Sequence, residues 1–153
     1  MIVTHVYAKL PDSSSGNLMG FCQVVFDNLL IVRDIKILNS GRGPFLAFPT
    51  RFLTDHCPNS ECKGKNRLEA RFCNWCGRPL QQNRFQLKPN GRPLIEESCT
   101  HPMNTDFRFY VQDEAMKALE RERYLVNEPC YQTNYPCSPD ERQLLEAASA
   151  VHP

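Results

Sequence analysis

The sequence has no long apolar run and contains little histidine or tryptophan. Its 153 residues include four histidines and one tryptophan, and no apolar stretch approaches the roughly 20 residues needed to cross a bilayer. Residues Met1 to Leu10 lack the charged segment followed by an apolar segment that is typical of a secretory leader. We therefore expect a cytoplasmic protein with no membrane partner.

Catalytic patterns are also missing. The histidines, His5, His56, His101 and His152, are scattered, and the sequence contains no Ser/His/Asp, HExxH or phosphate-loop pattern. His56 adjoins a cysteine but is expected to be a bystander, and His101 is expected to brace the turn before a helix. We expect neither an enzyme nor a small-molecule substrate.

Cysteine, by contrast, is plentiful, with eight in the chain. Four of them form two close pairs, Cys57 with Cys62 and Cys73 with Cys76, separated by ten residues. Each pair can present two thiolates from one turn, so two such turns complete a tetrahedron around Zn²⁺. Gly77 after the second pair is expected to let backbone amides point back at the sulfur atoms. The spacing therefore predicts a closed structural site, and such a site favours Zn²⁺ over Fe²⁺.

Disulfides and unrelated core thiols are the alternatives for these four residues. Disulfides need an oxidising compartment, to which nothing in the sequence points, and core thiols need no paired spacing. Among the other cysteines, Cys22 lies in an apolar strand pattern and is predicted to be a small core residue. Cys130 and Cys137 lie in a proline-rich tail, and their role stays open.

The formal net charge of +1 hides a separation of charge along the chain. Eight basic and two acidic residues between Cys57 and Arg92 give that stretch +6 and leave −5 for the remainder. Four thiolates on Zn²⁺ would contribute about −2, so the stretch would stay basic, at about +4. A basic lobe is typical of a protein with a polyanionic partner. The alternative is a solvated surface on a module too small for a core of its own.

The rest of the pattern predicts a small antiparallel sheet followed by a helix, an α+β fold. Apolar, β-rich runs at residues 2–10, 19–26, 29–38 and 44–49 are the expected strands. Asp27-Asn28 is expected to form a tight hairpin turn, because both residues tolerate positive φ. Ile35 and Ile37 share a face of their strand and are expected to be at least half buried.

A helix is expected from Asn104, which can cap it, with Asp106 in the first turn. Its apolar stripe is expected to lie on the sheet and consists of Phe107, Val111, Ala115, Ala118 and Leu119. Residues 94–97 are expected to return the chain to the sheet after a possible strand at 85–87. Within the cysteine region, Phe72, Trp75 and Leu80 are expected to be apolar contacts. Stacking of Trp75 on a nucleic-acid base is the less favoured alternative.

Several short segments occur in an order that resembles the SpoVG (stage V sporulation protein G) family. They are Val3-Thr4, Phe26-Asp-Asn-Leu29, Val32-Arg-Asp-Ile-Lys-Ile37, Gly43-Pro-Phe-Leu-Ala-Phe-Pro-Thr-Arg51, His101-Pro-Met-Asn104 and the helix around Arg108 to Leu119. The resemblance covers roughly residues 1–52 and 95–122. It implies a small antiparallel sheet with one C-terminal helix, usually as a homodimer. It also implies binding to DNA and RNA by bacterial regulators that are not enzymes.

The sequence departs from the family where relatives have only a short loop. We expect residues 1–52 and 94–125 to form a discontinuous SpoVG-like body. Residues 53–93 are expected to form an inserted zinc-ribbon-like module with the four cysteines as ligands, since surface loops tolerate insertions and a metal can organise a small insert. Residues 126–153 are expected to be a linker and a short helix, with a capping box that begins at Ser138.

The leading hypothesis is a regulatory protein that binds DNA, RNA or both. The resemblance implies contacts from Arg51 and Arg108, for which a surface salt bridge is the alternative. The basic module adds candidate phosphate contacts: Lys63, Lys65, Arg67, Arg71 and Arg78. The alternative function is a protein-interaction adaptor without a direct nucleic-acid role. The sequence gives neither the target site nor a preference between DNA and RNA.

Overall fold

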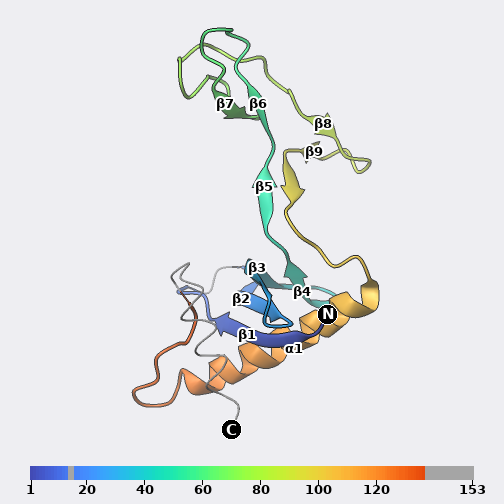
Figure 1. Ribbon diagram of the computed structural model, residues 1–153, viewed down its shortest axis with the longest axis vertical. Coiled ribbons are helices and arrows are strands. Elements are labelled where there is room, and N and C mark those ends of the chain that lie inside the picture. Colours follow the sequence, from blue (N-terminus) through green and yellow to red (C-terminus); the bar gives the residue numbers. More distant parts are fainter. Residues whose placement is uncertain (14–15, 137–153) are drawn as a thin grey trace. The chain divides into compact units, whose positions relative to one another are not determined.

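The computed structural model describes residues 1–13 and 16–136, and the chain divides into two units (Figure 1). The first unit consists of residues 1–49 and the chain from Thr100 onward, and the second is Thr50–Cys99. No helix in the described part of the chain is long and apolar enough to span a membrane.

The first unit is built on a four-stranded sheet with strand order β1-β2-β3-β4. The strands are β1 (Val3–Lys9), β2 (Leu18–Phe26), β3 (Leu30–Ser40) and β4 (Gly43–Ala47). Every neighbouring pair is antiparallel. Asp27, Asn28 and Leu29 join β2 to β3. Asp27 and Asn28 have φ angles of 50° and 53°, and the amide of Leu29 donates to the carbonyl oxygen of Phe26 at 2.9 Å, which confirms a tight turn at Asp27-Asn28. The antiparallel sheet of the expected α+β fold is therefore present.

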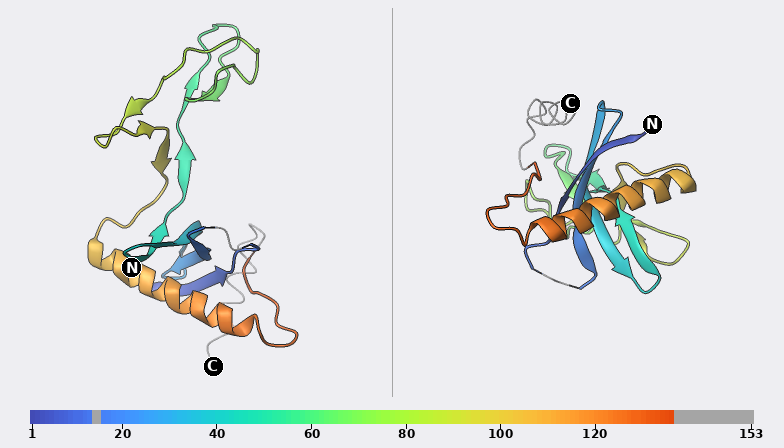
Figure 2. Two further views of the ribbon diagram at one scale, coloured as in Figure 1. Left: turned by 180° about the vertical axis from the view of Figure 1, so that it is seen from behind. Right: turned by 90° about the horizontal axis from the view of Figure 1, so that it is seen from below.

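The helix α1 (Thr105–Leu125) lies along one face of this sheet (Figure 2). Asn104 caps it, because its side chain accepts from the amides of Asp106 and Phe107 at 2.7 and 3.1 Å. Val111, Ala115 and Leu119 of the expected apolar stripe are fully buried in the core, and Phe107 and Ala118 are partly buried against it. Ile35 and Ile37 lie in the same core with no exposed surface, and so does Cys22. These sequence-based expectations are confirmed.

Residues 127–136 follow the helix without regular structure but keep contacts with the first unit. The Tyr131 hydroxyl donates to a Glu122 carboxylate oxygen at 2.7 Å, and this bond raises the pKa of Tyr131. Nε2 of Gln23 donates to the carbonyl oxygen of Pro136 at 3.1 Å. Cys137 and the short helix expected from Ser138 lie outside the described residues.

The second unit consists of three two-stranded pairs, β5–β10, β6–β7 and β8–β9. Its strands are β5 (Thr50–Phe52), β6 (Thr54–His56), β7 (Lys65–Arg67), β8 (Gln86–Leu87), β9 (Pro93–Leu94) and β10 (Glu96–Ser98). The expectation that residues 94–97 return to the main sheet is wrong, because β10 pairs with β5. That pairing places the unit's ends at 50 and 99, where the sequence led us to expect an insert of 53–93.

Candidate metal centre and basic surface

The four paired cysteines converge in the second unit. Cys57 directly follows β6 and Cys62 ends the next turn, while Cys73 and Cys76 lie in the loop after β7. The sulfur atoms of Cys57 and Cys76 are 3.8 Å apart, and those of Cys62 and Cys73 are 3.7 Å apart. All four sulfur atoms lie within 4.8 Å of one another. A tetrahedral ion bound at about 2.3 Å from each sulfur requires sulfur–sulfur distances of about 3.8 Å. The cluster can therefore hold one metal ion.

Hydrogen-bond donors point at the sulfur of Cys73. The amide of Trp75 and Nδ2 of Asn66 each lie 3.4 Å from it. Together with the amide of Cys76, which contributes most, these donors lower the pKa of Cys73 to about 6. Gly77 has a φ of 70°, as the expected permissive turn requires, but its amide donates to the carbonyl oxygen of Cys73. The amides that donate to the sulfur of Cys73 are those of Trp75 and Cys76, which precede Gly77.

The first pair of cysteines has the opposite electrostatic balance. An amide donor, from Gly64, lowers the pKa of the Cys62 thiol, but burial and the neighbouring thiols outweigh it and raise the pKa to about 11. The pKa of Cys57 is raised by the same combination, against the amide of Asn59. Several thiolates cannot accumulate in one cluster without a cation to offset their repulsion. The site is therefore chemically suited to a thiolate-binding metal ion.

Asn66, which the sequence did not lead us to expect, is hydrogen-bonded to the cysteine cluster. Its side chain is 1% exposed and lies between two exposed residues of β7, Lys65 and Arg67. Besides the bond to Cys73, its Nδ2 donates to the carbonyl oxygen of Gly64 at 3.0 Å, and its Oδ1 accepts from the amide of Asn74 at 2.8 Å. Alternation along a strand was the signal that could have found it, because two exposed basic residues place the residue between them inward.

Arg84 is the second supporting residue that sequence reasoning missed. Its Nε donates to a carboxylate oxygen of Asp55 at 2.6 Å. Its terminal nitrogens donate to three backbone carbonyl oxygens, those of Ala70, Gln81 and Arg67, at 3.2, 2.7 and 2.8 Å. Although it adds to the formal charge of the module, Arg84 ties together the segments around the cluster.

The seven basic residues expected to contact nucleic acid occupy different environments. Arg51 pairs with Glu97 at 2.9 Å, and this contact raises its pKa. The guanidinium of Arg67 lies 3.7 Å from the centre of the Phe52 ring. Within the described part of the chain, the other five form no ion pair, and all are exposed: Lys63, Lys65, Arg71, Arg78 and Arg108. Four of these five lie in the second unit, and Arg108 lies in the first turn of α1.

The apolar residues of the module divide into one buried and two exposed side chains. Leu80 packs with the buried cysteines, as expected. Trp75 and Phe72 are not buried, with exposed fractions of 77% and 59%, although Trp75 does contact Gly64 of the module. The unit is too small to bury them, because Cys57, Cys73 and Leu80 already form its small buried cluster.

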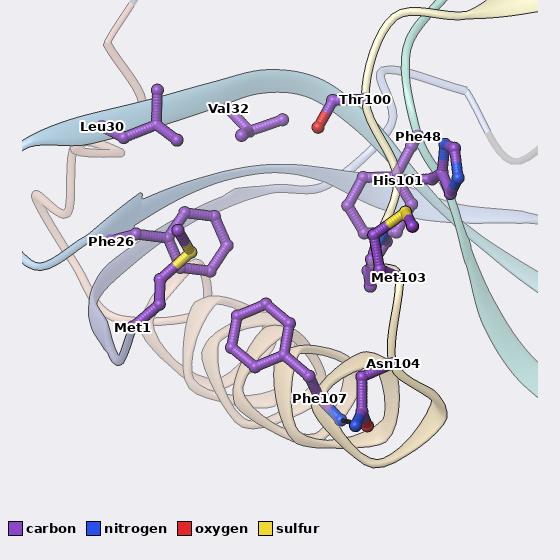
Figure 3. Close-up of a pocket in the computed structure, with 11 residues that line it drawn as sticks. Met1, Phe26, Leu30, Val32, Phe48, Thr100, His101, Met103, Asn104 and Phe107 are labelled. Atoms are coloured by element: carbon purple, nitrogen blue, oxygen red, sulfur yellow. Dashed lines mark hydrogen bonds between the residues drawn. The ribbon is translucent and has the colours of Figure 1, made fainter.

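A pocket of about 420 Å³ lies in the first unit, beside the start of α1 (Figure 3). Phe26 and Phe107 contribute rings whose centroids are 5.8 Å apart, and Met103 lies at the rim. His101 contributes the pocket's one titratable side chain among the described residues. The lining is otherwise mostly apolar, so the pocket offers a surface for apolar groups.

Comparisons with known proteins identify a family and several relatives of this chain. The model of the SpoVG family matches residues 1–121. A protein named "Putative septation protein SpoVG" from Clostridium beijerinckii is 35% identical over 60 residues, which are 35% of this chain and 66% of the relative. The protein of the same name from Acetivibrio thermocellus is 35% identical over 72 residues, 42% of this chain and 76% of the relative. The one from Borreliella burgdorferi is 34% identical over 53 residues, 33% of this chain and 55% of the relative.

Proposed function

The chain belongs to the SpoVG family, and from that premise we propose that it is a regulatory protein that binds DNA, RNA or both. In this proposal Cys57, Cys62, Cys73 and Cys76 hold one Zn²⁺ as a closed structural site. Zinc fits because four thiolates in tetrahedral arrangement are a typical structural zinc set, and no position is left for a reacting water. The metal keeps a basic lobe folded, and the protein acts in the cytoplasm.

The observation that carries the proposal is the set of unpaired basic side chains in the stretch that carries the four cysteines. Lys63, Lys65, Arg71 and Arg78 are exposed within one short stretch and form no ion pair in the described part of the chain. Acidic residues neutralise basic ones elsewhere in the unit, at Arg51 and Arg84. Four free cations on one small unit are suited to phosphate contacts, which supply affinity with little sequence information.

The test is a charge reversal with a matched control. The variant Lys63→Glu/Lys65→Glu/Arg71→Glu/Arg78→Glu is compared with Lys36→Glu/Arg42→Glu/Arg121→Glu/Arg123→Glu, which changes the net charge equally on exposed positions of the first unit. Binding to random DNA and RNA pools is measured across a salt series. Each lost phosphate contact should reduce the slope of log affinity against log salt by about 0.7 to 0.9. An unchanged affinity and slope in the module variant, at both low and moderate salt, would rule the proposal out.

We also propose that the chain forms a homodimer, as its family resemblance implies. Large apolar side chains of the first unit are available for burial, since Leu29 and Met103 are 89% and 92% exposed. Light scattering on the full chain should give twice the chain mass of 17.6 kDa. A mass equal to one chain over the working concentration range would contradict the dimer.

A further inference from the structure

Trp75 rests on the bare backbone of Gly64. A Cβ atom added to Gly64 would lie 2.3 Å from Cδ1 and 2.6 Å from Cγ of the indole. Such distances are far below van der Waals contact, so the ring can occupy this position only because residue 64 has no side chain. Gly64 is itself buried, while the indole above it is 77% exposed. One side of the ring is therefore supported, and most of its surface is open to solvent.

Both residues of this contact are hydrogen-bonded to the cysteine cluster. The amide of Trp75 donates to the sulfur of Cys73. The carbonyl oxygen of Gly64 accepts from the amide of Cys57 at 2.8 Å and from Asn66 at 3.0 Å. The indole is thus a rigidly based aromatic surface, which costs little conformational entropy when a ligand covers it.

Basic residues flank both Gly64 and Trp75 in the sequence. Lys63 and Lys65, both exposed, come directly before and after Gly64, the residue on which the ring rests. Arg71 and Arg78 are exposed in the loop that carries Trp75. Glu61 and Glu69 are the acidic residues of the stretch between Cys57 and Arg92, against eight basic ones. An aromatic face among cations is complementary to a base that is attached to phosphates.

We propose that Trp75 stacks on an unpaired base of single-stranded nucleic acid, while Lys63 and Lys65 contact the neighbouring phosphates. This inference rests on the proposed function and adds the form of nucleic acid that the module selects. In a duplex, each base face is covered by the next base pair, so the indole can stack only on a base outside a helix. Phosphate binding alone requires only the basic side chains, so it does not account for an exposed indole that rests on Gly64.

Trp75 is the single tryptophan of the chain, so its fluorescence reports on this ring alone. The full-length, metal-loaded protein is titrated with a fluorescein-labelled 12-mer of deoxythymidine, the corresponding uridine 12-mer, and a 12-base-pair duplex. Anisotropy of the label measures binding independently of the indole. We expect a single strand to quench Trp75 emission in step with the anisotropy, and the duplex to bind without comparable quenching.

Substitutions then separate stacking from folding. Trp75→Leu should weaken single-strand binding by about 5- to 150-fold, whereas Trp75→Phe should retain most of the affinity because it keeps an aromatic face. Leu87→Ala, at another exposed apolar position of the unit, is the matched control and should bind like the wild type. The metal content of each variant is measured, so that loss of the site is distinguished from loss of stacking.

The outcomes distinguish this inference from the proposed function. Single-strand binding with unchanged Trp75 emission, or with equal affinity for the leucine and phenylalanine variants, would overturn the stacking role and leave nucleic-acid binding in place. Absence of binding to all three oligonucleotides would overturn both, and would leave the exposed ring as a protein-docking surface.

Discussion

The side chain of Asn66 donates a hydrogen bond to the sulfur of Cys73 at 3.4 Å, from a position that is almost completely buried. The same side chain also bonds to backbone groups on both sides of the cluster, the carbonyl of Gly64 and the amide of Asn74. Asn66 thus fixes the relative positions of the segments that carry the two cysteine pairs.

Replacing Asn66 should weaken metal binding. Removing a hydrogen-bonding residue behind a metal ligand typically lowers metal affinity by about 10- to 100-fold, and we expect a loss in this range for Asn66→Ala. Competition with a chromophoric chelator measures it. Asn74→Ala is the control, because its side chain is exposed and the backbone amide that bonds to Asn66 is retained. Equal metal affinity in both variants would contradict the role assigned to Asn66.

Arg84 should stabilise the module and contribute little to nucleic-acid binding. Arg84→Met removes the donor from the carbonyl oxygens of Ala70 and Gln81 and from a half-buried Asp55 carboxylate, whereas the carbonyl oxygen of Arg67 keeps its bond from the amide of Ala70. The expected cost is about 1–3 kcal/mol. Amide hydrogen exchange in the second unit should accelerate correspondingly. Arg78→Met removes the same charge from an exposed side chain and should leave exchange unchanged. Amide exchange in the Arg84 variant that is as slow as in the wild type would contradict the stabilising role of Arg84.

In the first unit, Gly20 sets how closely α1 approaches the sheet. A Cβ at this position would lie 2.6 Å from Cδ1 of Leu119 and 2.8 Å from the carbonyl oxygen of Lys9. Gly20→Ala should therefore lower the free energy of unfolding by about 1–3 kcal/mol, as measured by urea denaturation. Gly41→Ala has open space around it and should be nearly neutral. The packing of α1 would need revision if the two variants were equally stable.

Metal binding should release protons from the first cysteine pair. The raised pKa values of Cys57 and Cys62, the latter about 11, keep these thiols protonated at pH 7.5 in the metal-free chain. Cys73, with a pKa of about 6, is already ionised there. Affinity should therefore rise with pH above 7, because fewer protons remain to be displaced. Calorimetry in two buffers of different ionisation enthalpy should give at least two protons released per ion at pH 7.5, and fewer would contradict this order of ionisation.

The sequence specified those parts of the fold that depend on local chemistry. Asp27-Asn28 forms its turn because of residue-level tolerance of positive φ, and Asn104 caps its helix through bonds to amides two and three residues away. The pairing of β10 with β5 could not be predicted, because it joins segments 46 residues apart. The supporting contacts of Asn66 and Arg84 depend in the same way on how loops meet. The spacing of the four cysteines was enough to predict that they converge, and their sulfur atoms lie close together in the structure.

The central claim is that a metal-held module carries the nucleic-acid contacts of this protein. The most direct measurement is a gel shift with random single-stranded and duplex pools, run before and after chelation, with metal quantified in the same samples by mass spectrometry. We predict one zinc per chain, loss of binding as the zinc is removed, and recovery when Zn²⁺ is restored. Binding that survives complete removal of the metal would assign the contacts to the sheet and helix of the first unit and contradict the claim.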